Sequence, residues 1–251
     1  MNFKDLHHQK KPLLLGNVWD VPSAKIAEKL GFQAIGTSSA AIASLLGYKD
    51  GEEMDFSELL YFVKRIRANT NLPLSVDMES GYSRDAKIIA KYIKQLADIG
   101  VVGINIEDSI VTGKRLLLDP IVFSEMISDV KNMLSKEHIN IFLNVRIDTF
   151  LLGHSNPLQE TKKRIRLYEN TGADGIFTPG AENESDIREI VTCTPLPINV
   201  MCMPNLSDFE TLADLGVQRI SMGNFLFDRM YSQLESTAKE VVAQQSFQSI
   251  F

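Results

Sequence analysis

The sequence predicts an α/β fold, a single (β/α)8 barrel (TIM barrel), and three observations lead to this prediction. Short apolar segments alternate with longer amphipathic segments along the whole chain, which is typical of parallel strands connected by helices. Eight strand–helix units fit into the 251 residues, about 31 residues for each unit, which suits a closed barrel. No Gly-x-Gly-x-x-Gly turn follows the first strand, as it would in an open sheet that binds a dinucleotide. Since no linker or low-complexity tract divides the chain, we expect residues 1–251 to form one domain.

The predicted strands are short and strongly apolar. Residues 103–106 and 141–145 have hydrophobic residues at both odd and even positions, as expected for strands that are buried on both faces. The eight strands are expected near residues 13–17, 34–39, 72–79, 103–108, 140–148, 175–180, 197–202 and 219–224.

The predicted helices have recognisable beginnings and ends. Asp119 and Asn156 each place a capping side chain before a proline at the first helical position. Residues 207–210 have the form of a capping box, and residues 55–58 imitate it with aspartate. Four helices are expected to end where a left-handed residue is needed, at Gly31, Gly100, Gly172 and Gly216.

Composition and charge exclude several classes of partner. The net charge of −6 argues against nucleic acid or an anionic membrane, because both require a basic face. It leaves room for a small anionic substrate, since a few local cations or a metal can reverse the sign inside one cleft. The apolar run at residues 13–15 is too short for a signal peptide or a membrane span, so we expect a cytoplasmic protein.

Polar side chains occur near the carboxyl ends of four predicted strands, where a barrel of this kind should otherwise be apolar. This end of the barrel carries the active site in essentially every barrel enzyme. The polar residues are Asp77 and Glu79, Asn105 and Glu107, Asn144, Arg146 and Asp148, and Asn199. Their recurrence at one end predicts a functional site there.

Three of these residues, Asp77, Glu79 and Glu107, form a candidate metal site. Residues two apart share one side of a strand, and neighbouring strands lie about 4.8 Å apart, so the three carboxylates can converge. Their mutual repulsion in a low-dielectric pocket requires a counter-charge. Ligands that offer only oxygen favour Mg²⁺ or Mn²⁺. The alternative is that these carboxylates form ion pairs with Arg146 and neighbouring lysines at the barrel rim.

At these residues the sequence resembles the isocitrate lyase/phosphoenolpyruvate mutase superfamily. The similarity extends over nearly the whole chain. It rests on the order of six blocks, which are residues 16–25, 31–39, 46–50, 77–82, 107–108 and 145–148, followed by residues 172–177 before the sixth strand. Of these, Asp77–Tyr82 matches an Asp-x-Asp-x-Gly-Tyr signature with Glu79 in place of the second aspartate.

The resemblance implies a reaction and a set of roles. Members of the superfamily make or break C–C or P–C bonds through the enolate of a 2-oxo acid. By the resemblance, Mg²⁺ is held near the three carboxylates, and the substrate carboxylate and 2-oxo group are bound by the metal, Arg146, Ser38 and Ser39. Asp50 aligns with a residue close to the reacting group and is a candidate catalytic residue, although a turn aspartate is nearly as well supported. Asn199, at its strand end, is a candidate substrate-binding residue.

The segment that selects the reaction departs from the family. Residues 109–118 contain neither the Lys-Lys-Cys-Gly-His motif of isocitrate and methylisocitrate lyases nor the gating-loop motif of phosphonate-handling members. Lys114 and Arg115 are the cations of this short loop, and Lys114 is a candidate catalytic residue. We expect a C–C lyase acting on a substituted malate- or oxaloacetate-like acid. The alternatives are P–C chemistry, as in phosphoenolpyruvate mutase or phosphonopyruvate hydrolase, and a metal-binding barrel without catalytic activity.

The C-terminal segment predicts an oligomer. A helix from residue 227 to about residue 244 is followed by the apolar tail at residues 247–251. Two exposed phenylalanines are unusual on a monomer, which indicates a subunit interface. The resemblance implies the same, because superfamily members are commonly dimers or tetramers that exchange a C-terminal helix. We therefore expect a homodimer or homotetramer.

Overall fold

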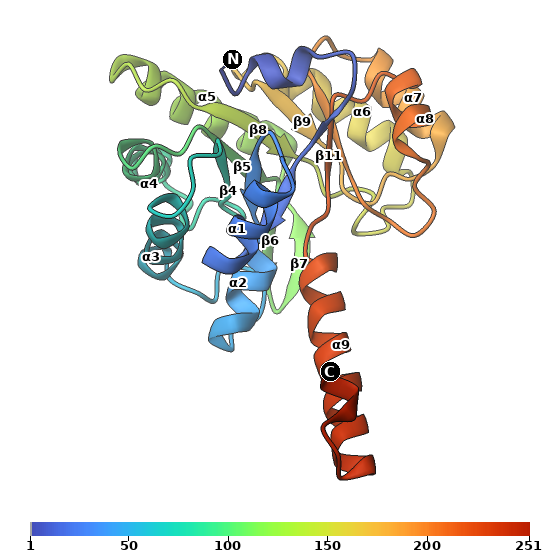
Figure 1. Cartoon of the computed structure of the whole chain (residues 1–251). Helices are drawn as coiled ribbons and strands as arrows, with labels where there is room; N and C mark the ends of the chain where they lie inside the picture. Colours follow the sequence, from blue (N-terminus) through green and yellow to red (C-terminus); the bar gives the residue numbers. More distant parts are fainter. Residues whose placement is uncertain (1) are drawn as a thin grey trace.

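The first strand closes the barrel by pairing on both of its sides. The computed structural model describes residues 2–251. Within it, β1 (Leu13–Leu14) pairs with β11 (Arg219–Ser221), while β2 (Gly16–Val18) pairs with β3 (Ile35–Thr37), all in parallel. Leu15 alone separates β1 from β2, so they are two halves of one strand that joins the two ends of the sheet. The predicted eight-stranded barrel is confirmed (Figure 1).

The remaining strands stand where the apolar segments predict them. They are β4 (Leu74–Asp77), β5 (Gly103–Glu107), β8 (Phe142–Arg146), β9 (Gly175–Phe177) and β10 (Ile198–Met201). Each pairs with its neighbours in parallel, in the order β3-β4-β5-β8-β9-β10-β11. Because neighbouring strands all run in one direction, their carboxyl ends meet at one end of the barrel.

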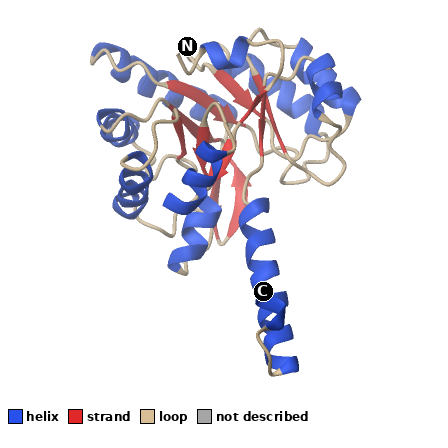
Figure 2. Ribbon diagram, in the orientation of Figure 1, coloured by secondary structure: helices blue, strands red, loops and turns tan. Residues whose placement is uncertain are grey.

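Helices surround the strands, as Figure 2 shows. They are α1 (Val21–Lys29), α2 (Ser39–Leu46), α3 (Phe56–Arg67), α4 (Ala86–Asp98), α5 (Pro120–Lys136), α6 (Pro157–Tyr168), α7 (Glu184–Thr192) and α8 (Phe209–Asp214); a further helix, α9 (Phe225–Gln244), follows them in the chain. The predicted cap at Asp119 is present and accepts hydrogen bonds from the first-turn amides of α5. Asn156 precedes α6 without a side-chain cap, and Asp208, not Ser207, caps α8.

The amino-terminal end of the barrel is plugged, and its interior above the plug is polar. The short 3-10 helix η1 (Asp5–His8) packs beneath the strands, and the ring of His7 stacks on Phe142 with centroids 4.1 Å apart. Burial, helped by the charge of Arg219, lowers the pKa of His7 to about 3, so this histidine is neutral. Above it, Asn144 donates hydrogen bonds to the amides of Asn105 and Asn199, at 2.9 and 3.2 Å.

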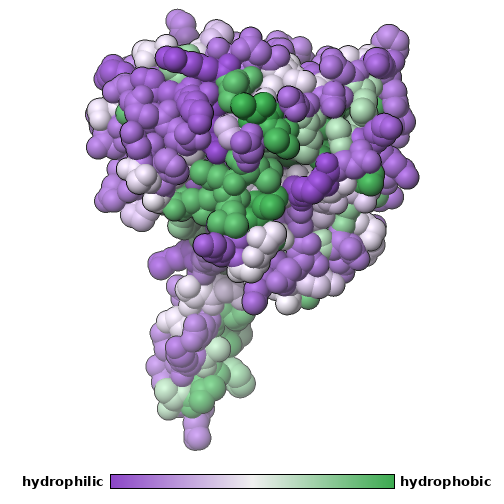
Figure 3. Space-filling view, turned by 180° about the vertical axis from the view of Figure 1, so that it is seen from behind, coloured by the Kyte–Doolittle hydropathy of each residue, from purple (hydrophilic) through white to green (hydrophobic). Residues whose placement is uncertain are grey.

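Helix α9 leaves the barrel body and extends away from it (Figures 1 and 2). Among its residues only Phe227 is buried, while Leu234 is 60% and Val242 is 77% exposed. A groove of about 470 Å³ lies between α8 and the strands β1 and β11, lined in part by Leu14 and Ile220. Figure 3 shows hydrophobic residues on α9 and a larger hydrophobic area on the barrel body above it. Among the described residues, no helix combines the length and hydropathy needed to cross a membrane.

Candidate active site

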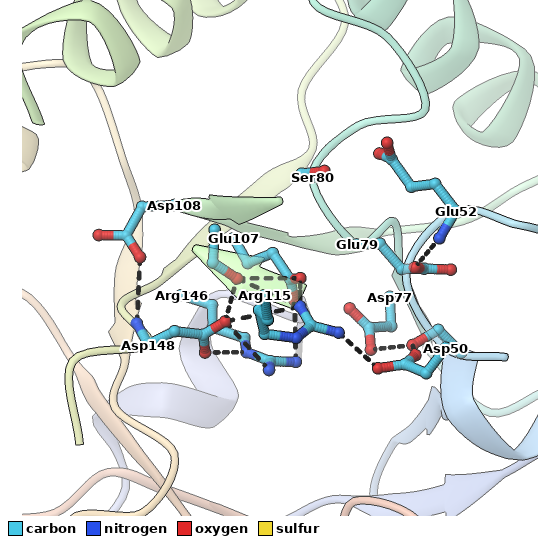
Figure 4. Close-up of polar contacts among 12 residues, drawn as sticks. Asp50, Glu52, Asp77, Glu79, Ser80, Glu107, Asp108, Arg115, Arg146 and Asp148 are labelled. Atoms are coloured by element: carbon cyan, nitrogen blue, oxygen red, sulfur yellow. Dashed lines mark hydrogen bonds and ion pairs between the residues drawn. The ribbon is translucent and has the colours of Figure 1, made fainter. Parts of the chain in front are cut away.

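The site lies where β4, β5 and β8 end, and the turn after α2 brings Asp50 to the same place. Figure 4 shows the carboxylates of Asp50, Asp77 and Glu107 grouped around two guanidinium groups. The carboxyl ends of neighbouring parallel strands meet here, so residues that are far apart in the sequence become neighbours. Most of the predicted site residues are therefore brought together.

Asp77 and Asp50 share one hydroxyl group. Ser39 Oγ lies 2.9 Å from Asp77 Oδ2 and 3.3 Å from Asp50 Oδ1. A serine hydroxyl has one proton to donate, so it cannot satisfy both carboxylates at once. The other oxygen of Asp77, Oδ1, is buried and has no hydrogen-bond partner. Burial raises the pKa of Asp77, and the nearby charge of Asp50 adds to the effect. Asp50 also forms an ion pair with Arg115, at 2.6 Å, whereas the buried Oδ1 of Asp77 is left without a partner.

Ser38 and Ser39 have different surroundings although they are adjacent. Ser38 is the N-cap of α2, and its hydroxyl accepts a hydrogen bond from Ala41 N at 3.4 Å. Ser39 is the first residue of the helix and directs its hydroxyl to the two aspartates. Of the two predicted substrate-binding serines, only Ser39 has its hydroxyl at the carboxylates, while Ser38 fixes the start of the helix.

Glu79 points away from Asp77, toward the turn that follows α2. Its backbone has a φ of 48°, and its carboxylate accepts hydrogen bonds from Tyr82 Oη, at 2.8 Å, and from the backbone amide of Glu52. Gly81, with a φ of 102°, allows the tight turn that brings Tyr82 back onto Glu79. Burial, together with the charge of Asp50, raises the pKa of Glu79 to about 7.

Glu107 is bound by two arginines. Arg115 forms an ion pair with Glu107 Oε1, and Arg146 Nη1 lies 2.9 Å from Glu107 Oε2. Arg146 also donates to Asp148 through Nε, at 2.6 Å, and Nη2, at 3.3 Å. Burial alone would lower the pKa of Arg146, but Asp148 and Glu107 outweigh it and raise the pKa well above its usual value. Arg146 therefore stays charged at the site.

These contacts differ from the arrangement on which the predicted metal site rests. The prediction required three converging carboxylates without local cations, but Glu107 has two arginines and Glu79 is turned aside. Among residues 2–251, no three Asp, Glu, His or Cys side chains are arranged to hold a metal ion. A cation does fit at Asp77, because its Oδ1 is buried and unpartnered and Asp50 stands beside it. Oxygen ligands alone are offered there, which suits Mg²⁺ or Mn²⁺.

The structure also places two further predicted site residues, Asn199 and Lys114. Asn199 lies in the barrel interior, 1% exposed, where its amide binds Asn144 and the backbone of Val200. Residues 109–117 form a β-hairpin, β6 (Ser109–Thr112) and β7 (Lys114–Leu117), and not an open loop. Successive side chains of a strand point to opposite sides. The Lys114 side chain is thus exposed, while Arg115 points to the carboxylates.

A buried ion pair beside the site is a feature that the sequence did not predict. Asp108, 0% exposed, accepts hydrogen bonds from Arg164 Nη1 at 2.7 Å and Tyr168 Oη at 3.0 Å. Its other oxygen accepts a hydrogen bond from the amide of Asp148, at 3.0 Å. The pair therefore fixes the backbone of Asp148, which in turn holds Arg146. The signal was the spacing of the buried face of α6, residues 161, 164, 165 and 168, where position 164 is an arginine.

Comparisons with known proteins show the family of the chain. The family model described as phosphoenolpyruvate phosphomutase matches residues 3–242. The chain belongs to the phosphoenolpyruvate phosphomutase family. The resemblance to the phosphoenolpyruvate mutase/isocitrate lyase superfamily is confirmed, and with it the prediction of an enzyme of this type.

Relatives in this family carry out more than one reaction. An uncharacterized protein of Mycobacterium tuberculosis is 36% identical over 89% of this chain and 82% of its own length. An oxaloacetate decarboxylase of Pseudomonas entomophila is 30% identical over 83% of this chain and 72% of its own. The crystal structure of 2,3-dimethylmalate lyase matches 97% of this chain and 86% of the lyase chain, with a TM-score of 0.85. The two sequences are 18% identical, so this similarity supports the fold alone.

Proposed function

We propose that the protein is a lyase that depends on a divalent metal and cleaves a C–C bond in a small 2-oxo or 2-hydroxy carboxylic acid through an enolate. The observation that carries the proposal is the Asp77–Asp50 pair, in which two carboxylates share one hydroxyl and one buried oxygen has no partner. The pair lies beside Arg146, whose charge is held by Asp148 and Glu107. A cation and a guanidinium side by side suit a substrate with a carboxylate next to an oxo group.

The charges at the site also favour a metal. Four carboxylates meet at the site, namely those of Asp50, Asp77, Glu107 and Asp148, and the two guanidinium groups within their reach are those of Arg115 and Arg146. An anionic substrate entering this field would be repelled unless a cation came with it. Mg²⁺ or Mn²⁺ at Asp77 would supply this charge and stabilise the enolate oxygen as a Lewis acid.

The chain's own residues supply the remaining functions. Arg146 binds the substrate carboxylate through its remaining N–H donors, because a planar guanidinium can offer two parallel hydrogen bonds. Ser39 at the first position of α2 orients Asp77 and lies where free amides of a helix begin. Asp50 is 36% exposed and stands next to Asp77, so it is placed to accept the proton of a substrate hydroxyl.

P–C chemistry is the second candidate. It is favoured by a phosphoenolpyruvate phosphomutase of Tetrahymena pyriformis, which is 25% identical over 91% of this chain and 78% of its own length. A migrating phosphoryl group needs several cations or amides around it. The hairpin directs only Arg115 inward, and Lys114 is exposed. We therefore rank C–C cleavage first.

A substrate panel tests this ranking. Purified protein with Mg²⁺ is incubated with oxaloacetate, with substituted malates and with phosphonopyruvate, and the release of 2-oxo acid and of phosphate is followed. We expect Mg²⁺-dependent 2-oxo acid release from one of the dicarboxylic acids, and no phosphate or phosphoenolpyruvate from phosphonopyruvate. Turnover of phosphonopyruvate on the order of 1 s⁻¹, which is within the usual enzymatic range, would reverse the ranking.

We further propose that the protein is a homodimer or homotetramer whose α9 packs on a partner subunit. Helix α9 extends from the barrel with Leu226, Met230 and Leu234 at 46 to 60% exposure. The groove beside α8 offers an apolar surface that α9 of its own chain leaves uncovered. A truncated chain that ends at residue 224 is expected to elute as a monomer in size-exclusion chromatography with light scattering. An oligomer of unchanged mass after truncation would contradict this proposal.

A further inference from the structure

The hairpin β6–β7 forms one side of the candidate active site and brings Arg115 into it. It packs on the turn that carries Asp50, since a Cβ at Gly51 would lie only 2.4 Å from Val111 of β6. The hairpin turns at Gly113, whose φ is 80°. Arg115 is 15% exposed at its side chain, whereas its neighbour Lys114 faces solvent. The fold therefore selects Arg115, and not Lys114, as the hairpin cation that faces the site.

The guanidinium of Arg115 bridges the partly exposed Asp50 and the buried Glu107. Nη2 lies 2.6 Å from Asp50, and Nη1 forms an ion pair with Glu107. Nη1 is also 3.2 Å from Ser109 Oγ and 3.7 Å from Asp148. In Figure 4 the guanidinium lies in the middle of the group, between Glu107 and Asp50 and beside Asp77. The Arg115 guanidinium therefore lies close to the position proposed for the cation at Asp77.

Arg115 can exchange these partners without leaving a buried charge alone. Glu107 keeps the contact with Arg146 at 2.9 Å, and Asp148 keeps its two hydrogen bonds from Arg146. Asp50 is partly exposed and stays within reach of the Ser39 hydroxyl. Arg146, by contrast, is locked by Asp148, which is 0% exposed. Of the two guanidinium groups, only that of Arg115 is free to follow a ligand at low energetic cost.

We propose that Arg115 determines specificity by binding the second carboxylate of a dicarboxylic substrate. This inference rests on the proposed function, in which Arg146 and a cation at Asp77 bind the 2-oxo acid end. Arg115 then exchanges Asp50 and Glu107 for the distal carboxylate through two parallel hydrogen bonds, which a guanidinium fork forms best. A monocarboxylic acid leaves Arg115 on Asp50 and gains nothing from it.

Ligand pairs that differ only in the distal group test this role. Malate and 2-hydroxybutyrate share the 2-hydroxy acid end, but a methyl group replaces the second carboxylate in the latter. Their dissociation constants are measured by calorimetry with saturating Mg²⁺, and oxalate, which lacks a distal group, is measured beside them. For the unaltered protein we expect malate to bind roughly tenfold to hundredfold more tightly than 2-hydroxybutyrate, as a charge-assisted pair allows.

The substitution Arg115→Met is expected to bring this ratio close to one and to leave oxalate affinity unchanged. Arg115→Lys keeps the positive charge but loses the two parallel hydrogen-bond donors, so part of the preference for malate over 2-hydroxybutyrate should remain. Lys114→Met, one residue away on the exposed side of the same strand, should keep the full ratio. If Arg115→Met fails to fold, a clear loss of the ratio in Arg115→Lys carries the test.

Each contrary result has a distinct meaning. If Arg115→Met still binds malate much more tightly than 2-hydroxybutyrate, Arg115 does not have the proposed role. If the Arg115→Met protein does not fold, an unchanged preference for malate in Arg115→Lys leads to the same conclusion. An unaltered protein that binds oxalate with Mg²⁺ but does not prefer malate also overturns it, while the proposed function stands. If the unaltered protein does not bind oxalate, the proposed function fails first and the role of Arg115 fails with it.

Discussion

Asp77→Asn is expected to lower Mg²⁺-dependent turnover on the order of a thousandfold. Asparagine keeps the shape of the side chain but removes the charge that would hold the cation, and Lewis-acid stabilisation of an enolate contributes several kcal/mol. At 1.36 kcal/mol for each factor of ten, that loss gives roughly 10³ in rate. The measurement is the initial rate of 2-oxo acid release, at saturating Mg²⁺, from the substrate that the panel identifies.

Thermal unfolding separates this effect from simple damage to the fold. Mg²⁺ at about a hundred times its Kd should stabilise the unaltered protein by about 2.7 kcal/mol, a rise in Tm of roughly 5–10 °C for a chain of this size. Asp77→Asn should lose this rise. Without Mg²⁺ its Tm should equal or exceed that of the unaltered protein, because a buried and unpartnered carboxylate oxygen has been neutralised.

The exposed Asp98→Asn, at the end of α4, is the matched control and should keep the full response to Mg²⁺. If Asp77→Asn shows the same Mg²⁺-induced rise in Tm as the unaltered protein, Asp77 does not hold the cation. The site would then be a network of ion pairs, the alternative reading of the same carboxylates that the sequence left open.

The barrel could be predicted because its signal is local. Each strand is a short apolar run, and each helix begins or ends at a residue whose backbone preference is known, such as Gly100 and Gly172, which both have positive φ in the structure. The end of the barrel that carries the site followed from the same pattern, because polar residues at apolar strand ends stand out. None of these inferences required knowledge of which side chains touch.

The detailed contacts of the site could not be predicted because they depend on how distant segments meet. Strand parity places Asp77 and Glu79 on one side, but a φ of 48° at Glu79 turns its side chain toward the backbone of Glu52. The sequence predicts a short loop at residues 109–118, but in the structure a hairpin returns Arg115 to Glu107, eight positions earlier. A left-handed non-glycine residue and a hairpin without a strong turn signature leave little trace in one sequence.

Arg164→Met is expected to destabilise the protein by about 3–5 kcal/mol, because it leaves the buried carboxylate of Asp108 without its counter-charge. The pair is 2.7 Å apart, with side chains 5% and 0% exposed. Urea unfolding at neutral pH measures the change in the free energy of unfolding. Lys163→Met is the control. The side chain of Lys163 is 63% exposed, so its ion pair with Glu160 should contribute less than about 1 kcal/mol to stability.

The double variant Asp108→Asn/Arg164→Met decides whether the loss comes from the unpaired charge or from packing. If the charge is the cause, neutralising Asp108 should restore a large part of the stability that Arg164→Met loses. Since Asp108 also accepts the amide hydrogen of Asp148, which holds Arg146, oxalate affinity should fall in Arg164→Met and stay normal in Lys163→Met. A loss below 1 kcal/mol in Arg164→Met would show that Asp108 finds water or takes up a proton when the guanidinium is gone, and that the pair does not support the site.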